Sequence, residues 1–350
     1  MADPTIARSS WVRITRSVLT WRLTRAILGG RRPVLIIPIF ILSAVVIAGI
    51  TADWIAPHHP TQGNLRDRLL PPFWVGEQTT LKRVVGEVEI GLGHKQITLF
   101  KGSKIKKDAV IGDDVQVVTR QGGSVKFFLG TDHLGRDVLT RIIYGARISL
   151  IMAGLTLVVG GTIGVTVGMV AGWYGGWVDE LLMRTVDIIL ALPLILIALV
   201  MVVALGPSFQ LIVVIMAIAI WPLFSRVTRS EVLRVKEMDY VALSRVAGAS
   251  TLRIIFFHIF PGITNSVIVV ATLLVGVVIL LEAALSFLGA GVPVPTPAWG
   301  SMLAEGRDRI AVAWWVSSLP GVAIFLTVLS LNLFGDWLRD ALDPRLRQLE

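Results

Sequence analysis

Two acidic side chains stand beside long apolar segments and are the first candidates for chemistry in this chain. Glu282 follows the apolar run Val277–Leu281, and Asp187 begins another apolar stretch. If these segments cross a membrane, a carboxylate at such a depth is costly and is a functional candidate by default. Glu282 could face a cationic group of a substrate or hydrogen-bond a neighbouring helix. Asp187 lies three residues after Arg184, which predicts a local ion pair near one membrane face.

The sequence carries none of the common motifs for catalysis or nucleotide binding. It has no Gly-Lys dipeptide and therefore no P-loop, and it contains neither His-Glu-x-x-His nor Gly-x-Ser-x-Gly. The absence of cysteine excludes disulfides, thiolate catalysis and cysteine-ligated metals. His58, His59 and His94 are too scattered to indicate a metal site. We therefore expect a protein that is not an enzyme and that binds no cofactor or metal itself.

The composition is typical of a membrane protein. Of the 350 residues, 54% are hydrophobic and only 16% are charged, and the mean hydropathy is +0.74. Soluble domains carry about 25% charged residues. The expected fold class is therefore an all-α polytopic membrane protein. The net charge of +9 could suggest nucleic acid, but in a membrane protein the position of the charges matters more than their sum, and we expect no nucleic-acid partner.

Uncharged apolar stretches predict six transmembrane helices, since about 20 apolar residues cross a bilayer core of about 30 Å. The first helix falls within residues 33–55. A Gly-Pro pair at Gly206-Pro207 predicts a tight turn between the third and fourth helices. The stretches are Pro33–Ala52, Ile151–Trp173, Ile188–Gln210, Leu211–Ser225, Gly262–Leu281 and Ala311–Gly335.

Arginine and lysine placement predicts which side of the membrane each loop faces. Seven arginines and one acid lie in the first 33 residues, and six basic residues lie in Arg226–Phe257. Because basic residues are retained on the cytoplasmic side, we expect a multi-pass membrane protein with both termini in the cytoplasm. Residues 1–32 are expected to form an interfacial helix on the cytoplasmic leaflet, because Trp11, Ile14, Val18 and Trp21 recur at helical spacing.

The segment between the first two predicted spans, residues 56–128, is long enough to be an extracytoplasmic region. Its middle, about residues 77–126, consists of short alternating runs separated by glycine, lysine and aspartate clusters. This pattern predicts a small β-rich insert. The insert could be a docking surface for an external partner or a solvated spacer.

Small residues in the second predicted span indicate close helix packing. Gly160, Gly164, Gly168 and Gly172 recur every four residues, which places four positions without side chains along one stripe of the helix. Such a stripe allows another backbone to approach closely. Three prolines inside predicted spans permit kinks. They are Pro193, Pro222 and Pro320.

The loop between the fourth and fifth predicted spans, residues 226–261, has the pattern of two short helices. A first helix is expected to end at Gly248-Ala249-Ser250, and a second, with Ser250 as its N-cap, to end before Pro261. A helix–turn–helix of this kind offers a rigid projection for the groove of a partner.

This loop resembles the EAA loop of ABC-importer permeases, although the glutamate of that pattern is missing. In the resemblance, Ala242, Leu243 and Ser244 occupy the Glu-Ala-Ala positions, Gly248 the glycine, His258 the isoleucine and Phe260-Pro261 the Leu-Pro. Further segments are similar to the second (C-type) permease subunit of the dipeptide/oligopeptide/nickel family. These are Leu129–Val138, Tyr144–Arg147, Leu285–Gly289, Pro297–Gly300, Asn332–Asp336 and Arg339–Pro344.

The resemblance implies a location in the cell inner membrane and a type I ABC-importer permease fold with a permease core over residues 129–347. It also implies a heterodimer with a paralogous permease, an extracytoplasmic solute-binding protein, and two cytosolic ATPase subunits that bind ATP and Mg. The residues expected to contact an ATPase subunit are Tyr240, Ala242, Ser244, Arg245, Gly248, Ala249, Ser250, Arg253 and Pro261. Peptides are the expected substrates; nickel chelates, glutathione or another small solute are alternatives, and an ion-coupled secondary transporter is a more distant one.

Overall fold

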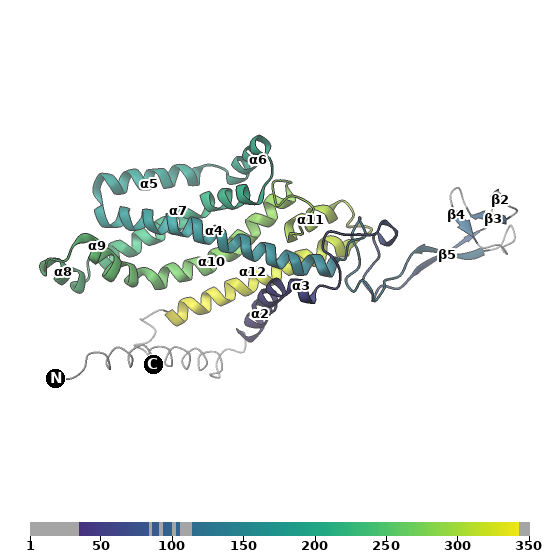
Figure 1. Ribbon diagram of the computed structural model, residues 1–350, viewed down its shortest axis with the longest axis horizontal. Helices are drawn as coiled ribbons and strands as arrows, with labels where there is room; N and C mark the ends of the chain where they lie inside the picture. The colour runs from purple at the N-terminus through teal and green to yellow at the C-terminus, as the bar shows by residue number, and fades with distance from the viewer. Residues whose placement is uncertain (1–34, 84–85, 91–93, 100–102, 106–113, 343–350) are drawn as a thin grey trace.

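The computed structural model of the protein describes residues 35–83, 86–90, 94–99, 103–105 and 114–342. The helix expected for residues 1–32 lies outside this range. Long helices lie side by side in a bundle, with strands projecting beyond one end and short helices at the other (Figure 1). We call these the strand end and the α8 end.

The bundle is built around four long helices. These are α4 (Val138–Tyr174), α7 (Phe209–Lys236), α10 (Phe260–Phe287) and α12 (Trp314–Leu342). Shorter helices pack on them or connect them: α2 (Ile36–Ile50), α3 (Ala52–Ile55), α5 (Gly176–Ala191), α6 (Leu194–Leu205), α8 (Asp239–Val246), α9 (Thr251–Ile254) and α11 (Trp299–Arg307). A single 3-10 turn, η2 (Leu65–Asp67), lies in the loop after α3.

Within the described residues, four helical runs are long and apolar enough to cross a membrane: α4, α7, Thr251–Phe287 and α12. The pair α5 and α6 qualifies as a fifth, although its two helices are bent by 79°. The apolar helix α2, with 15 residues, is shorter. The protein is therefore a multi-pass membrane protein.

The third predicted span, Ile188–Gln210, is broken at Pro193, one of the prolines expected to permit a kink. The helix breaks at Leu192-Pro193, and Pro193 takes the N-cap position of α6. Proline disfavours helical backbone in the residue before it, which accounts for the break. The predicted turn after α6 is present: Gly206 has a φ of 79°, and the hydroxyl of Ser208 accepts a hydrogen bond from Leu211 N in the first turn of α7.

The strands lie in the segment where the alternating pattern predicted them. Strand β1 (Gln78–Arg83) pairs antiparallel with β5 (Asp114–Arg120). The remaining strands form a three-stranded antiparallel sheet in the order β2-β3-β4, with bounds Gly86–Ile90, His94–Leu99 and Ser103–Ile105. These strands extend away from the helical bundle (Figure 1).

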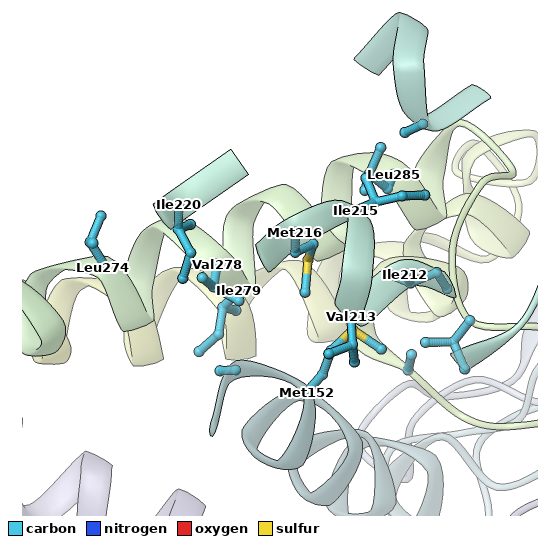
Figure 2. Packing of buried hydrophobic residues seen from close by; sticks show 14 of the residues in the cluster. Met152, Ile212, Val213, Ile215, Met216, Ile220, Leu274, Val278, Ile279 and Leu285 are labelled. Carbon is cyan, nitrogen blue, oxygen red and sulfur yellow. The ribbon is translucent and has the colours of Figure 1, made fainter. Parts of the chain in front are cut away.

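The main hydrophobic core lies between α4, α7 and α10. Met152 of α4 packs in one cluster with Ile215 and Met216 of α7 and with Val278 and Ile279 of α10, all almost fully buried (Figure 2). Pro222 and Pro320 lie inside α7 and α12, as the sequence predicted. The core fixes the relative positions of the helices that carry the polar groups described below.

Candidate functional site

The four glycines of the predicted stripe form the contact between α4 and α7. A Cβ added at Gly160 would lie 2.6 Å from Ile220, one at Gly168 2.6 Å from the carbonyl oxygen of Ser225, and one at Gly172 2.8 Å from Val232. Gly164 is as closely packed, against Trp221 and Phe224. Real Cβ atoms do not approach so closely, so only glycine permits this separation of the two helices.

The contact has a regular register. Gly160 meets Ile220, Gly164 meets Phe224, Gly168 meets Thr228 and Gly172 meets Val232, so that each partner lies 60 positions further along the chain. The two helices therefore run parallel. Glycines at every fourth residue of α4 pack against side chains at every fourth residue of α7.

At the α8 end, α8 and α9 form a projection whose outer surface is apolar. Leu243 and Val246 are 67% and 87% exposed, and Leu252 on α9 and Phe257 in the following turn are 67% and 73% exposed. Together with the half-exposed Tyr240 we call these residues the apolar projection. Exposed apolar groups gathered on one projection mark a contact with a partner or a membrane.

A separate hydrophobic cluster supports the projection from beneath. It joins Val232 and Val235 at the end of α7, Val241 of α8, Ile254 of α9 and residues at the start of the following long helix, all nearly fully buried. Gly248 follows the C-cap residue of α8 and has a φ of 75°, and nothing lies within 4 Å of the point where a Cβ would stand. Glycine adopts this backbone conformation without steric cost, so the turn between α8 and α9 follows from the residue found there.

The second short helix does not end before Pro261. Helical backbone continues from Thr251 to Phe287 through a π-helical turn, η3 (Ile255–Ile259). Pro261 lies in the first turn of α10, where a residue without an N–H group is tolerated. The π-helical turn just before it accommodates the altered pattern of backbone hydrogen bonds. Ser250 does take the N-cap position of α9, but its side chain makes no capping hydrogen bond there.

Asp187 is paired with a different arginine from the one predicted. Its Oδ1 accepts a hydrogen bond from Nη2 of Arg226 on α7 at 2.6 Å, and both side chains are about half exposed. A second ion pair between the same helices joins Arg229 to both carboxylate oxygens of Asp179, at 2.5 Å each. Asp187 therefore ties α5 to α7, and the expected local pair with Arg184 was wrong.

Glu282 is enclosed by the chain, with 1% of its surface exposed. Its Oε1 accepts a hydrogen bond from the Ser286 hydroxyl at 2.7 Å, one turn along α10, while Oε2 makes no hydrogen bond within the described residues. This placement argues against the first of the two alternatives for Glu282, in which it faces a cationic group of a substrate. Its hydrogen bond also stays within α10 and does not reach a neighbouring helix.

Sequence reasoning missed a buried charge cluster at the strand end. Asp132 accepts hydrogen bonds from Arg136 and Arg141 at 2.6 Å each, and Glu305 of α11 accepts from the same two guanidinium groups at 2.6 and 2.8 Å. Both arginines are almost fully buried. The segment Leu129–Val138 stood out only for its resemblance, and Glu305 lies too far along the chain for spacing to indicate the pairing.

The surroundings lower the pKa values of two residues at this cluster, Asp132 and His133. Burial raises the pKa of the Asp132 carboxyl, but Arg141, Arg136 and two backbone N–H groups outweigh this effect and hold the pKa below its usual value. Burial also lowers the pKa of His133, whose Nδ1 lies 4.0 Å from Glu305. Asp132, His133 and Glu305 have the spacing of metal ligands. Two guanidinium groups already neutralise the two carboxylates, so the geometry fits an ion-pair cluster better than a cation site.

The comparisons with known proteins identify the family. A family model described as "Binding-protein-dependent transport system inner membrane component" matches residues 164–348, over half of the chain. The chain belongs to this family.

Relatives extend the match over most of this inner membrane component. The di/tripeptide transport system permease protein DppC of Pseudomonas aeruginosa (strain UCBPP-PA14) is 40% identical over 87% of this chain and 85% of its own length. The dipeptide transport system permease protein DppC of Escherichia coli (strain K12) is 43% identical over 87% and 86%. Among solved structures, the MetNI methionine ABC transporter in inward-facing conformations is 19% identical, with a TM-score of 0.49, and covers 59% of this chain and 97% of its own.

The residues expected to contact an ATPase lie together in this family member. Tyr240, Ala242, Ser244 and Arg245 belong to α8, Gly248–Ser250 to the turn, and Arg253 to α9, while Pro261 lies inside the long helix that follows. Glu282 and Asp187 lie apart from them, on α10 and α5.

Proposed function

We propose that this chain is the permease subunit of an ATP-driven importer, that it forms half of the translocation pathway, and that the imported solutes are di- and oligopeptides. The observation that carries the proposal is the apolar projection, which is held rigidly by its own hydrophobic cluster at one end of a membrane-spanning bundle. Two relatives that are 40–43% identical over most of their length carry names that specify dipeptide or di/tripeptide transport.

The proposed membrane arrangement has six spans in a type I importer permease fold. Helix α2 and the bent pair α5–α6 join the four long helical runs as the first and third spans. Both termini and the α8 end face the cytoplasm, and the strand end faces outward. The basic residues of Arg226–Phe257 support this orientation, because such residues are retained on the cytoplasmic side.

Four partners follow from this proposal. A paralogous permease completes the pathway, an extracytoplasmic solute-binding protein delivers the peptide, and two cytosolic ATPase subunits hydrolyse ATP. The apolar projection seats in a groove of one ATPase subunit, as an amphipathic helix does in a partner's groove. Closure of the ATPase dimer moves the projection, and rigid-body movement of the helices switches access from one side to the other.

The first experiment is a pull-down of the detergent-solubilised chain, co-expressed with its candidate partners. Gly248→Trp adds a bulky side chain to the projection, and Gly206→Trp is its matched control. Both glycines have a positive φ and open space where a Cβ would stand, but Gly206 lies in the turn between α6 and α7. We expect wild type and Gly206→Trp to recover the paralogous permease and the ATPase subunits, and Gly248→Trp to lose only the ATPase subunits.

Recovery of no partner by the wild-type chain, together with transport driven by a proton gradient, would overturn the importer proposal in favour of a secondary transporter. Competition of labelled dipeptide uptake by unlabelled dipeptide, nickel chelate and glutathione in the reconstituted complex tests the substrate class. Absence of labelled dipeptide uptake, or uptake that excess unlabelled dipeptide does not reduce, contradicts the assignment to peptides.

A further inference from the structure

Two basic residues from different helices meet on one indole at the α8 end. The guanidinium carbon of Arg245, in the last turn of α8, lies 4.7 Å from the centroid of the Trp173 ring. The ammonium group of Lys236, the last residue of α7, lies 5.8 Å from the same centroid and donates a hydrogen bond to the backbone oxygen of Trp173 at 2.8 Å. The ends of α4, α7 and α8 therefore meet at Trp173.

Each of these contacts has a physical basis that does not depend on a partner protein. A cation over an aromatic face is attracted by the ring quadrupole, and the flat guanidinium of arginine also stacks on it. The last carbonyl groups of a helix lack partners within the helix, so the lysine bond caps α4 at its end. Trp173 also packs against the hydrophobic cluster beneath the apolar projection.

A second contact holds α8 from its neighbouring turn. The hydroxyl of Ser244 lies 3.2 Å from Nε2 of His258, which belongs to the π-helical turn η3. Both residues differ from the EAA pattern, which has alanine at the position of Ser244 and isoleucine at the position of His258. The two residues that differ are therefore in contact with each other. Adjacent residues of α8 thus attach it to two elements: Ser244 to η3 and Arg245 to α4.

We propose that Trp173 is a positioning residue that makes α8 move together with α4, so that displacement of the apolar projection is passed to the α4–α7 pair. This inference rests on the proposed function, since it concerns how the force from the ATPase subunits is transmitted. The glycine register extends the connection along the bundle, because Gly172, next to Trp173, is already packed against Val232 of α7.

The test measures transport and ATP hydrolysis together in the complete complex, reconstituted in proteoliposomes with its binding protein. Trp173→Leu keeps an apolar side chain but removes the ring, Trp173→Phe keeps a ring, and Arg245→Ala removes the cation. We expect Arg245→Ala to lower the peptide transported per ATP hydrolysed by roughly three- to fivefold, the population shift that corresponds to losing one exposed cation–π contact. Trp173→Leu also removes the contact with Lys236 and should lower the ratio by at least as much. Trp173→Phe should recover most of the ratio.

The matched control is a guanidinium–ring contact at the other end of the bundle. Arg307 of α11 lies 5.3 Å from the centroid of the Phe287 ring, and Arg307→Ala removes this contact without touching the α8 end. Its ratio should equal that of wild type. The double variant Trp173→Leu/Arg245→Ala separates the inference from a direct contact of Arg245 with the ATPase. If Arg245 acts through the indole, the double variant should be no worse than Trp173→Leu alone.

A spectroscopic measurement gives a readout that transport alone does not. The chain has no cysteine, so Tyr174→Cys and Ala247→Cys place one spin label at the end of α4 and one after α8, both at exposed positions. We expect one narrow distance distribution that is the same with and without ATP, and a broadened one when Arg245→Ala is added. An unchanged distribution, or equal transport ratios in all variants, overturns the inference. Because the experiment uses complexes that retain their ATPase subunits, that result would leave the importer proposal intact.

Discussion

The hydroxyl of Ser225 on α7 donates a hydrogen bond to the backbone oxygen of Gly164 on α4, across 3.0 Å in the buried interior. The bond joins a side chain of α7 directly to the backbone of α4. It depends on the absence of a side chain at Gly164, because a Cβ there would overlap Trp221 and Phe224.

Gly164→Ala should therefore destabilise the protein although alanine is the better helix former. Overpacking of this kind costs about 1–3 kcal/mol. Gly154→Ala is the matched control, because nothing lies within 4 Å of a Cβ at that position of the same helix, and it should be neutral or stabilising by up to about 1 kcal/mol. Thermal unfolding of the two variants in detergent, followed by tryptophan fluorescence, compares them. Equal midpoints would contradict the packing argument.

Asp132→Asn should be among the most destabilising substitutions at the strand end. It leaves the buried guanidinium groups of Arg136 and Arg141 with only Glu305 as a charged partner in the cluster. Removing one partner of a buried ion pair typically costs about 3–5 kcal/mol. Asp308→Asn breaks the exposed pair with Arg307 and should cost less than about 1 kcal/mol. The same unfolding assay measures both variants. A similar loss of stability in the two would contradict a larger contribution from the buried cluster than from the exposed pair.

Acidification should weaken the strand end in two steps. The pKa of His133 is below its usual value in the folded state, so stability is full above the unfolded value of about 6.5 and falls as the pH drops through the folded value. The lowered pKa of Asp132 gives a second loss, beginning near the unfolded value of about 3.9. The groups that act on His133 are Asp132, Glu305, Arg309 and Arg136.

His133→Gln separates the two steps. It should abolish the dependence of the unfolding midpoint on pH between about 7 and 5, while leaving the loss below about pH 4 unchanged. A wild-type midpoint that is flat between pH 7 and 5 would contradict the assignment of the first step to this histidine.

A double-mutant cycle can test the corrected partner of Asp187. Asp187→Asn and Arg226→Gln should show a coupling energy of about 0.2–1 kcal/mol, as expected for a half-exposed pair. The cycle with Arg184→Gln should show a smaller value, because the carboxylate points to α7. A larger coupling to Arg184 would restore the local pair that the sequence spacing suggested.

Local patterns explain which features the sequence predicted. The glycine stripe, the turn at Gly206 and the alternating runs of the β segment are all read over a few neighbouring residues, and the structure has the corresponding features there. Asp187 pairs with an arginine 39 positions away, and Arg136 and Arg141 pair with Glu305 more than 160 positions away. A single sequence holds no signal for such pairings, since many arginines stand at equally plausible distances.

The sequence showed where prolines lie within the predicted helices, but it did not show whether each one breaks its helix. Pro193 breaks the third predicted span, Pro222 lies within a continuous α7, and Pro261 lies in a helix that continues past it. Which of these occurs depends on whether neighbouring turns can rearrange their hydrogen bonds, as the π-helical turn before Pro261 does. That choice is made by tertiary packing around each proline.

The matched register of α4 and α7 limits how this chain can rearrange. Side chains of α7 occupy the glycine positions at every turn, so a small translation of one helix along the other would drive each of them against backbone. The next equivalent fit lies a full turn away, about 5.4 Å along the axis. Any movement shorter than that has to carry both helices as a single body, and the sliding surfaces of the transport cycle must lie elsewhere in the bundle.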